Sequence, residues 1–471
     1  MKNILSIRLI KLTAVVLMLF SLATSCKKLI EVPANPASSV STTQIFADSV
    51  DVMGVIAGIY HNFGATDQGT SILSTALPEA VCLTGDEMYT TITYNPDVLQ
   101  LYNNAILTNS GSIYTLWSTA YTPIYQLNAC LEGMAASNGI STSLKKQLTG
   151  EVKVVRALYY FHLVNLFGDV PLITSTDYKS NAVRPRTSTD SVYGQIIADL
   201  SDAMQLLPAS YPSAGRARPN VYTAMALLSK VYLYRKQYEL SANLASQVIN
   251  SHVYGLEPDL NNVFLDGSNE AIWQLPATGL YYPTSMAMAF VPYPGSPPSY
   301  PLTNSLVAAF EPGDHRLSAW IGSTTIDDGS GNLTNYSYPN KYKNTSLSAS
   351  TVEDQMMVRL GDLILIRAEA LAQQNKLDSA KADLNLVRIR AGLGNTAAGS
   401  QSDLVAGILH ERQVELFCEA ADRWYDLKRT GTVDAVLGTE KSGWQSYDAL
   451  YPIPITDIHA DPYLTQNPHY N

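Results

Sequence analysis

A stripe of glutamates near the end of the chain is the first candidate for chemistry. Glu411, Glu415 and Glu419 recur every four residues, so on one helix they share a face. Glycoside hydrolysis uses two carboxyl groups that face each other across the sugar, about 5–10 Å apart. One helix would carry all three glutamates, and arginines follow at positions 423 and 429. We therefore expect an ion-pair network here rather than acid–base catalysis.

A second set of charges lies inside an apolar segment. Arg359, Asp362 and Glu369 are surrounded by leucine, isoleucine and alanine. Charges in such surroundings are costly unless they are paired. We expect these three side chains to be paired and structural.

Three short motifs resemble metal or nucleotide sites, but each lacks a necessary part. His410 begins an HExxH-like run in which Val414 stands in place of the second histidine, so two ligands cannot face one zinc ion. Residues 392–397 fit GxGxxA, yet they follow a helical pattern, which indicates helix termination. Residues 327–332 lack the full ligand series for calcium and favour a surface turn. The sequence leaves open whether the protein contains a structural calcium ion. No metal site and no cofactor are predicted.

The four cysteines are too few and too widely spaced for a disulfide framework or a zinc site. They stand at positions 26, 82, 130 and 418. Cys130 and Cys418 lie in apolar helical patterns, which favours packing in the core.

The first 25 residues have the pattern of an export signal. Three basic residues precede an apolar run over 12–23, which is too short to span a bilayer. Small residues lead into Cys26, as in a bacterial lipobox, although Ala23 replaces the usual leucine. We expect Cys26 to be acylated and to anchor the protein; the alternative is ordinary cleavage with a free Cys26 thiol. Residues 27–45, rich in Pro, Ser and Thr, read as a tether.

Composition narrows the class of protein. The net charge is −10, only 15% of residues are charged, and no basic run follows the N-terminus. Nucleic-acid binding requires a basic footprint, so nucleic acid is not an expected partner. Tyrosine is abundant, with 29 residues against 9 phenylalanines, so most aromatic rings carry a polar tip.

Hydrophobic periodicity predicts long helices in pairs, with little strand. The expected helices are 114–135, 143–167, 191–207, 221–234, 238–250, 352–374, 377–389 and 404–428. The pair 221–250 resembles a tetratricopeptide unit. Two loop-rich regions, 64–110 and 255–350, separate the helical blocks, and 270–275 reads as a short strand. The predicted fold is mostly α, a tetratricopeptide-like helical-pair scaffold with long irregular loop regions and a few short strands.

Aromatic residues in the loop regions are the candidates for ligand contact. Aromatic rings stack on the C–H faces of sugars, and the polar tips of Tyr and Trp form hydrogen bonds. Tyr159, Tyr160, Tyr232 and Tyr234 have helical spacing and are expected in the core, as is the strand residue Trp273. The candidates for ligand contact are Tyr89, Tyr94, Tyr281, Tyr282 and Trp320.

Several blocks of residues occur in a fixed order along nearly the whole mature chain. They are Cys26–Pro33, Trp117-x3-Tyr121-x2-Ile124-x3-Asn128, Gly150–Phe161, Phe167–Leu172, Arg359–Asp362, Arg367–Ala370, Asn385–Gly392, Glu411–Glu419, Arg423–Arg429, Tyr451–Pro454 and Gln466–Tyr470. Together they resemble the SusD/RagB family of outer-membrane nutrient-binding lipoproteins. One departure is Cys418–Asp422, where the family tends to have a glycine before the arginine.

The resemblance implies a surface lipoprotein of the outer membrane that binds a glycan, or sometimes a peptide, and performs no catalysis. It implies a SusC-like TonB-dependent transporter as partner, which the protein caps as a lid. The implied organisation is a signal peptide over 1–25, a lipidated tether over 26–45 and one SusD-like domain over 46–471, with an N-terminal part to about 250 and a C-terminal part from about 255. Two alternatives stay open: a glycoside hydrolase, and a helical-repeat assembly lipoprotein that binds only protein.

Overall fold

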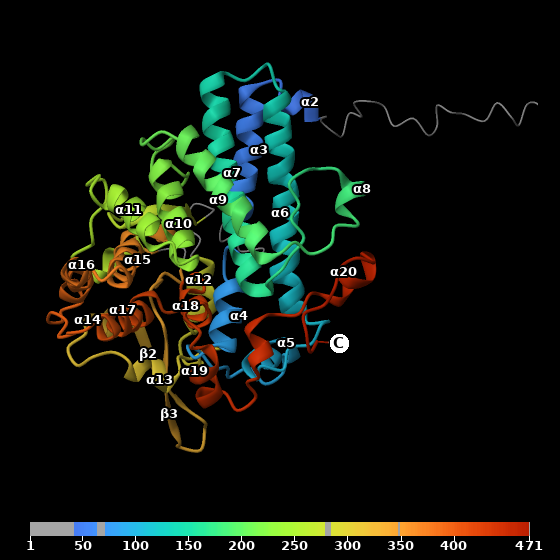
Figure 1. The fold of residues 1–471 in the computed structure, drawn as a ribbon. Coiled ribbons are helices and arrows are strands. Elements are labelled where there is room, and N and C mark those ends of the chain that lie inside the picture. Colours follow the sequence, from blue (N-terminus) through green and yellow to red (C-terminus); the bar gives the residue numbers. More distant parts are fainter. Residues whose placement is uncertain (1–41, 64–70, 278–283, 347–348, 471) are drawn as a thin grey trace, which may run out of the picture.

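The computed structural model describes residues 42–63, 71–277, 284–346 and 349–470 (Figure 1). The helices are α2 (Thr42–Ile45), α3 (Ser49–Phe63), α4 (Ala76–Thr84), α5 (Pro96–Tyr102), α6 (Gly111–Ala136), α7 (Thr142–Phe167), α8 (Tyr178–Asn181), α9 (Thr189–Leu206), α10 (Val221–Tyr234), α11 (Tyr238–Ile249), α12 (Ser285–Phe290), α13 (Asn304–Ala308), α14 (His315–Trp320), α15 (Leu360–Gln373), α16 (Leu377–Arg390), α17 (Gln401–Leu416), α18 (Asp422–Thr430), α19 (Val433–Glu440) and α20 (Ile455–Ala460). The strands are β1 (Ala271–Pro276), β2 (Ile321–Asp327), β3 (Leu333–Pro339) and β4 (Asp354–Arg359). The prediction of a mostly helical chain with few short strands is confirmed.

Long helices form the scaffold. Figure 1 shows α3, α6, α7 and α9 side by side in one half, with α10, α11, α15, α16 and α17 gathered beside them. The pair α10–α11 begins at a capping box between Asn220 and Thr223. The helices then approach closely, since Ser229 and Ser241 each donate a hydroxyl hydrogen bond, 2.8 Å long, to the other's backbone carbonyl. Helix α7 ends at Phe167, and the cap residue Gly168 has a φ of 73°, which glycine adopts readily.

Two predicted helices differ from the structure. Residues 354–359 form β4, which pairs antiparallel with β1, and the helix starts only at Leu360. A short apolar run cannot be assigned to strand or helix by periodicity alone. The predicted helix 404–428 is two helices, because Cys418, Ala420 and Ala421 all have positive φ angles and break it between α17 and α18.

The predicted loop regions also contain regular structure. Helices α4 and α5 lie within 64–110, and α12, α13, α14 and the β2–β3 hairpin lie within 255–350. Helix α5 has a clear start signal: Asn95 caps it through its side chain, and Pro96 occupies the first turn. Residues 327–332 form the hairpin turn, where Asp327 and Asp328 accept hydrogen bonds from backbone amides, so the surface turn is confirmed.

The predicted ion-pair network is buried, and its first part lies around Glu415. This Glu415 cluster consists of Arg316, Arg359 and Arg390 with Glu270, Glu411, Glu415 and Glu419. Arg359 lies 2.6 Å from Glu415 and 2.9 Å from Glu419, and Arg316 lies 2.8 Å from Glu415. Burial alone would raise the pKa of Glu415, but Arg390, Arg359 and Arg316 hold it well below its usual range.

A second buried network lies around Arg412. It joins α17 to α15, α18 and α10, since Arg412 pairs with Asp362 and Asp426, and Lys230 pairs with Asp362 and Asp422. Beside it, Arg429 forms two 2.6 Å hydrogen bonds to Glu369. The expectation that Asp362 and Glu369 are paired and structural is confirmed, as it is for Arg359.

Aromatic packing completes the core next to these networks. Trp424 of α18 is 1% exposed and contacts the rings of Trp444 and Tyr451, with centroids 5.9 and 6.1 Å away. Its indole N–H has no acceptor among the described residues. The expected burial of Tyr159, Tyr160, Tyr234 and Trp273 is confirmed, and Tyr232 is partly buried. None of the described helices is long and apolar enough to cross a membrane.

We expect Trp424→Ala to lower the free energy of unfolding by about 3–5 kcal/mol, because it leaves a cavity between Trp444 and Tyr451. Trp424→Phe should lose clearly less, since it keeps a ring there and removes a buried N–H without an acceptor. Urea unfolding of both variants measures the difference. An unchanged melting temperature for the alanine variant would contradict the packing described.

We expect Arg359→Met to lower the free energy of unfolding by about 3–5 kcal/mol at pH 7, because it leaves buried carboxylates without their counter-ion. The loss of the guanidinium raises carboxyl pKa values in the folded variant, so folding takes up protons. The loss in free energy of unfolding, relative to the parent protein, should therefore become smaller as the pH falls from 7 to 5.

The matched control for this experiment is Arg235→Met, which breaks an exposed pair with Asp190. Such surface pairs contribute about 1 kcal/mol or less. Equal losses for the two variants in urea unfolding would show that the Glu415 cluster does not stabilise the fold.

Candidate functional site

The two loop-rich regions meet and run side by side. Met88 forms an antiparallel bridge with Leu302, and the Tyr89 amide donates to the Pro301 carbonyl over 2.9 Å. Thr91 donates both its amide and its hydroxyl to this second segment. The two loop regions, which are more than 200 residues apart in places, therefore share one surface.

Strand β3 joins this pair as a third segment. The Leu302 amide donates to the Ser337 carbonyl over 2.8 Å, which places β3 beside 298–302. Tyr336 and Tyr338 are two residues apart on β3, so their side chains share one face. On β2, Gly322 leaves room for the ring of Tyr338, with which a Cβ would collide.

Tyrosines on these three segments and on the chain next to them form what we call the tyrosine surface. It comprises Tyr89, Tyr94, Tyr102, Tyr293 and Tyr336. Tyr94 is 85% exposed and Tyr293 is 81% exposed, and the other three are partly buried. Large aromatic rings with this exposure are free to contact a ligand.

Electrostatic coupling links Tyr89 to Tyr336 and Tyr102, and Tyr94 to Tyr300. Partial burial raises the pKa of Tyr89, and the hydroxyls of Tyr336 and Tyr102 raise it further. Nearby, Tyr300 is buried and donates its hydroxyl to Glu79 over 2.6 Å, and burial, Glu79 and Tyr94 raise its pKa. With a raised pKa, Tyr89 carries its proton at neutral pH and can both donate and accept hydrogen bonds.

The predicted ligand residues have three different outcomes. Tyr89 and Tyr94 lie on the tyrosine surface. Tyr281 and Tyr282 lie outside the described residues, as does Cys26. Trp320 is wrong as a ligand residue.

Trp320 is buried beneath the Glu415 cluster. Its side chain is fully buried, and its indole N–H donates to the Leu260 carbonyl over 3.0 Å. Lys341 and Arg390 lie over its ring, 4.8 and 5.5 Å from the centroid. It ends α14, a short helix that the sequence did not reveal, and the five tryptophans of the chain are all buried.

Tyr102, Tyr293 and Tyr336 belong to the tyrosine surface although the sequence analysis does not select them as ligand candidates. A hairpin signal could have pointed to Tyr336: residues 324–326 and 336–338 are rich in β-formers and flank an Asp/Gly-rich turn. Nothing in the sequence shows which of the loop tyrosines remain exposed.

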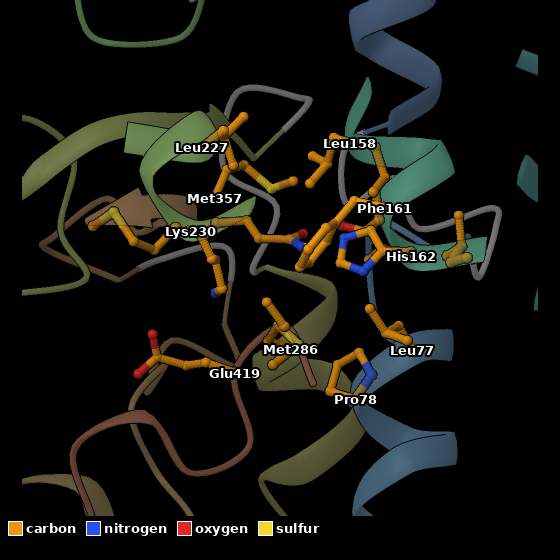
Figure 2. Close-up of a pocket in the computed structure, with 16 residues that line it drawn as sticks. Leu77, Pro78, Leu158, Phe161, His162, Leu227, Lys230, Met286, Met357 and Glu419 are labelled. Atoms are coloured by element: carbon orange, nitrogen blue, oxygen red, sulfur yellow. The ribbon is translucent and has the colours of Figure 1, made fainter. Parts of the chain in front are cut away.

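A pocket under the helical pairs is too small for a sugar. Figure 2 shows Leu158, Phe161, His162, Lys230 and Met286 among the residues that line it. Its volume is about 50 Å³, whereas ligand sites take about 300 Å³ or more. Burial and nearby Lys230 lower the pKa of His162 to about 3, so its imidazole is neutral at physiological pH. The pocket is a packing feature rather than a ligand site.

Cys82, Glu87 and Cys418 bring potential metal-ligating atoms within 4.8 Å of one another. The Glu87 carboxyl already accepts from the Cys82 thiol and from the Cys418 amide, each over 3.1 Å. Burial and Asp86 raise the pKa of Glu87 to about 7. Cys418 stands in the turn between α17 and α18 rather than in a helix, and the expected burial of Cys130 and Cys418 is confirmed.

The helical glutamates are engaged elsewhere. Glu411, Glu415 and Glu419 all pair with arginines of the Glu415 cluster. Because these carboxylates are buried and paired, they do not face a substrate, and the preference for an ion-pair network is confirmed.

Comparisons with known proteins agree with this architecture. Residues 36–233 match the family model described as "Starch-binding associating with outer membrane", and residues 311–470 match the model of the SusD family. Two proteins of Formosa agariphila, SusD-like protein P38 and SusD-like protein P2, are 23% and 26% identical. The matches cover 98% and 96% of this chain, and 99% and 95% of those proteins.

Solved structures have the same fold. A SusD superfamily protein from Bacteroides vulgatus superposes with a TM-score of 0.77 at 19% identity, over 89% of this chain and 99% of that one. A laminarin-binding SusD-like protein superposes with a TM-score of 0.74 at 24% identity, and the match covers 90% of this chain and 100% of that one. Surface glycan-binding protein A from Bacteroides thetaiotaomicron, in complex with laminarihexaose, also has a TM-score of 0.74, at 19% identity. That match covers 89% of this chain and 99% of the other. The order of helical pairs, the two family matches and these full-length similarities agree, and the chain belongs to the SusD/RagB family.

Proposed function

We propose that this protein binds a glycan at the tyrosine surface and delivers it to a SusC-like TonB-dependent transporter in the outer membrane. The observation that carries the proposal is the convergence of three segments, with Tyr94 and Tyr293 largely exposed on the chain next to them. A similar fold binds laminarihexaose in one of the solved structures, which supports a glycan as the ligand class.

The physical basis is the two-sided chemistry of a sugar ring. Its C–H faces pack on aromatic rings, and its hydroxyls exchange hydrogen bonds with phenol groups. Tyr89 and Tyr336 come from different segments that backbone hydrogen bonds hold together, so their rings are positioned before a ligand arrives. Such preorganisation lowers the entropic cost of binding.

Anchoring at Cys26 would place this surface outside the cell. The signal-like segment, the cysteine and the tether are sequence features, and family membership supports the outer membrane as the location. Acyl chains give stable attachment when more than one is present. The helical carboxylates are paired with arginines and do not face a substrate. This supports a protein that captures a ligand at the cell surface and passes it to a transporter.

We expect at least two of Tyr89→Ala, Tyr94→Ala, Tyr293→Ala and Tyr336→Ala to weaken glycan binding by about 1–3 kcal/mol, as central aromatic contacts do. Calorimetry would use oligosaccharides of β-glucan, including laminarihexaose, and of α-glucan, xylan and mannan. The melting temperatures should stay unchanged.

The control is Tyr125→Ala on α6, where the side chain is 49% exposed and lies outside the tyrosine surface. It should bind like the parent protein. If the four surface variants also do so, the tyrosine surface is not the binding site. If the parent protein binds none of the oligosaccharides, glycan binding itself is contradicted.

We expect Cys26→Ala to release the protein from membranes, because the acyl chains are its proposed attachment. Detergent-free fractionation of cells that lack the transporter would measure this. A variant that still sediments with the outer membrane would contradict lipid anchoring at Cys26, whereas Cys82→Ala should remain membrane-bound.

A further inference from the structure

A second pocket is far larger than that in Figure 2. It opens between α6, the segment after α7 and α20, and its volume is about 410 Å³. This α6–α20 pocket contains no residue of the tyrosine surface. In Figure 1, α20 lies beside the lower part of α6. The volume falls in the range of small-molecule sites, about 300–1,000 Å³.

One face of α6 supplies the aromatic wall. Tyr114, Trp117 and Tyr121 recur at helical spacing and line the pocket together. Trp117 is 3% exposed, and the Tyr121 hydroxyl donates to the Pro171 carbonyl over 2.8 Å. Both rings are therefore fixed, whereas Tyr114 leaves 48% of its surface exposed.

Charged side chains of both signs complete the lining. Asp457 and Asp461, one turn apart on and after α20, supply carboxylates, and Arg184 supplies a guanidinium. The Trp117 indole N–H donates to Asp457 over 3.1 Å and fixes that carboxylate. Among the described residues, these three side chains form no ion pair within 4.0 Å. In the two buried networks, by contrast, each charge has an opposite charge beside it.

We infer that the α6–α20 pocket binds one or two sugar units of a carbohydrate, as a second site apart from the tyrosine surface. Sugar hydroxyls both donate and accept, so one ligand satisfies the carboxylates and the guanidinium together. The ring of Tyr114 offers a face for sugar C–H groups. A purely anionic or cationic ligand would meet like charge on one wall. The inference extends the proposed glycan binding, but the site it names is separate.

The test is saturation-transfer NMR with glucose, galactose, mannose, xylose and laminaribiose on the full mature chain. At least one of these sugars should give a signal. Tyr114→Ala and Arg184→Ala should each weaken its binding about tenfold. Tyr125→Ala is the matched control, because its side chain has nearly the same exposure on the same helix, 49% against 48%.

A Tyr94→Ala/Tyr293→Ala double variant separates the two sites. It should keep the signal that depends on Tyr114, even if the tyrosine surface proves not to bind glycan. The inference is overturned if no sugar gives a signal, or if Tyr114→Ala and Arg184→Ala bind like Tyr125→Ala with unchanged melting temperatures. It is also overturned if only the dipeptide glycylglycine, tested in parallel, binds in a Tyr114-dependent way.

Discussion

The pairing of buried guanidinium and carboxylate groups around Glu415 is the constraint on which the rest of the structure depends. Its members come from the turn before β1, from α14, β4, α16 and α17, and from the turn after α17. A buried charge that loses its partner is strongly destabilising. The elements that carry these charges must therefore pack in an arrangement that keeps every charge paired. An apolar core alone would tolerate small shifts between helices, whereas a bidentate ion pair fixes both distance and direction.

The same cluster determines where the tyrosine surface lies. Arg316 and Trp320 belong to α14, and β2 begins at the next residue, Ile321. The hairpin that carries Tyr336 therefore starts directly from the buried network. On the other side, Glu87 and Asp86 accept hydrogen bonds from Thr303, which couples the 298–303 segment to the end of α4. The exposed tyrosines thus stand on loops whose bases are anchored in the core, as binding loops on rigid scaffolds commonly are.

Sequence reasoning predicted the scaffold well, because long amphipathic helices have a strong periodic signal. The predicted helix 221–234 agrees with α10 at both ends, and 377–389 differs from α16 by one residue. The helix predictions were wrong where tertiary contacts override the local pattern. Residues 354–359 pair with β1 as strand β4, and the turn at Cys418 interrupts the predicted helix 404–428. Trp320 shows the limit for the site: a tryptophan in a polar loop region was expected at the surface, but cations that are distant in sequence bury its ring. Exposure depends on such long-range contacts, and one sequence does not display them.

The burial of all five tryptophans has a consequence for spectroscopy. Indole emission depends on the polarity and solvent access of the ring, and here every indole lies in the core or at its edge. Tryptophan fluorescence of this protein will therefore follow unfolding closely. A ligand on the tyrosine surface touches no indole, so its arrival will change phenol absorbance and leave the tryptophan spectrum almost unaltered.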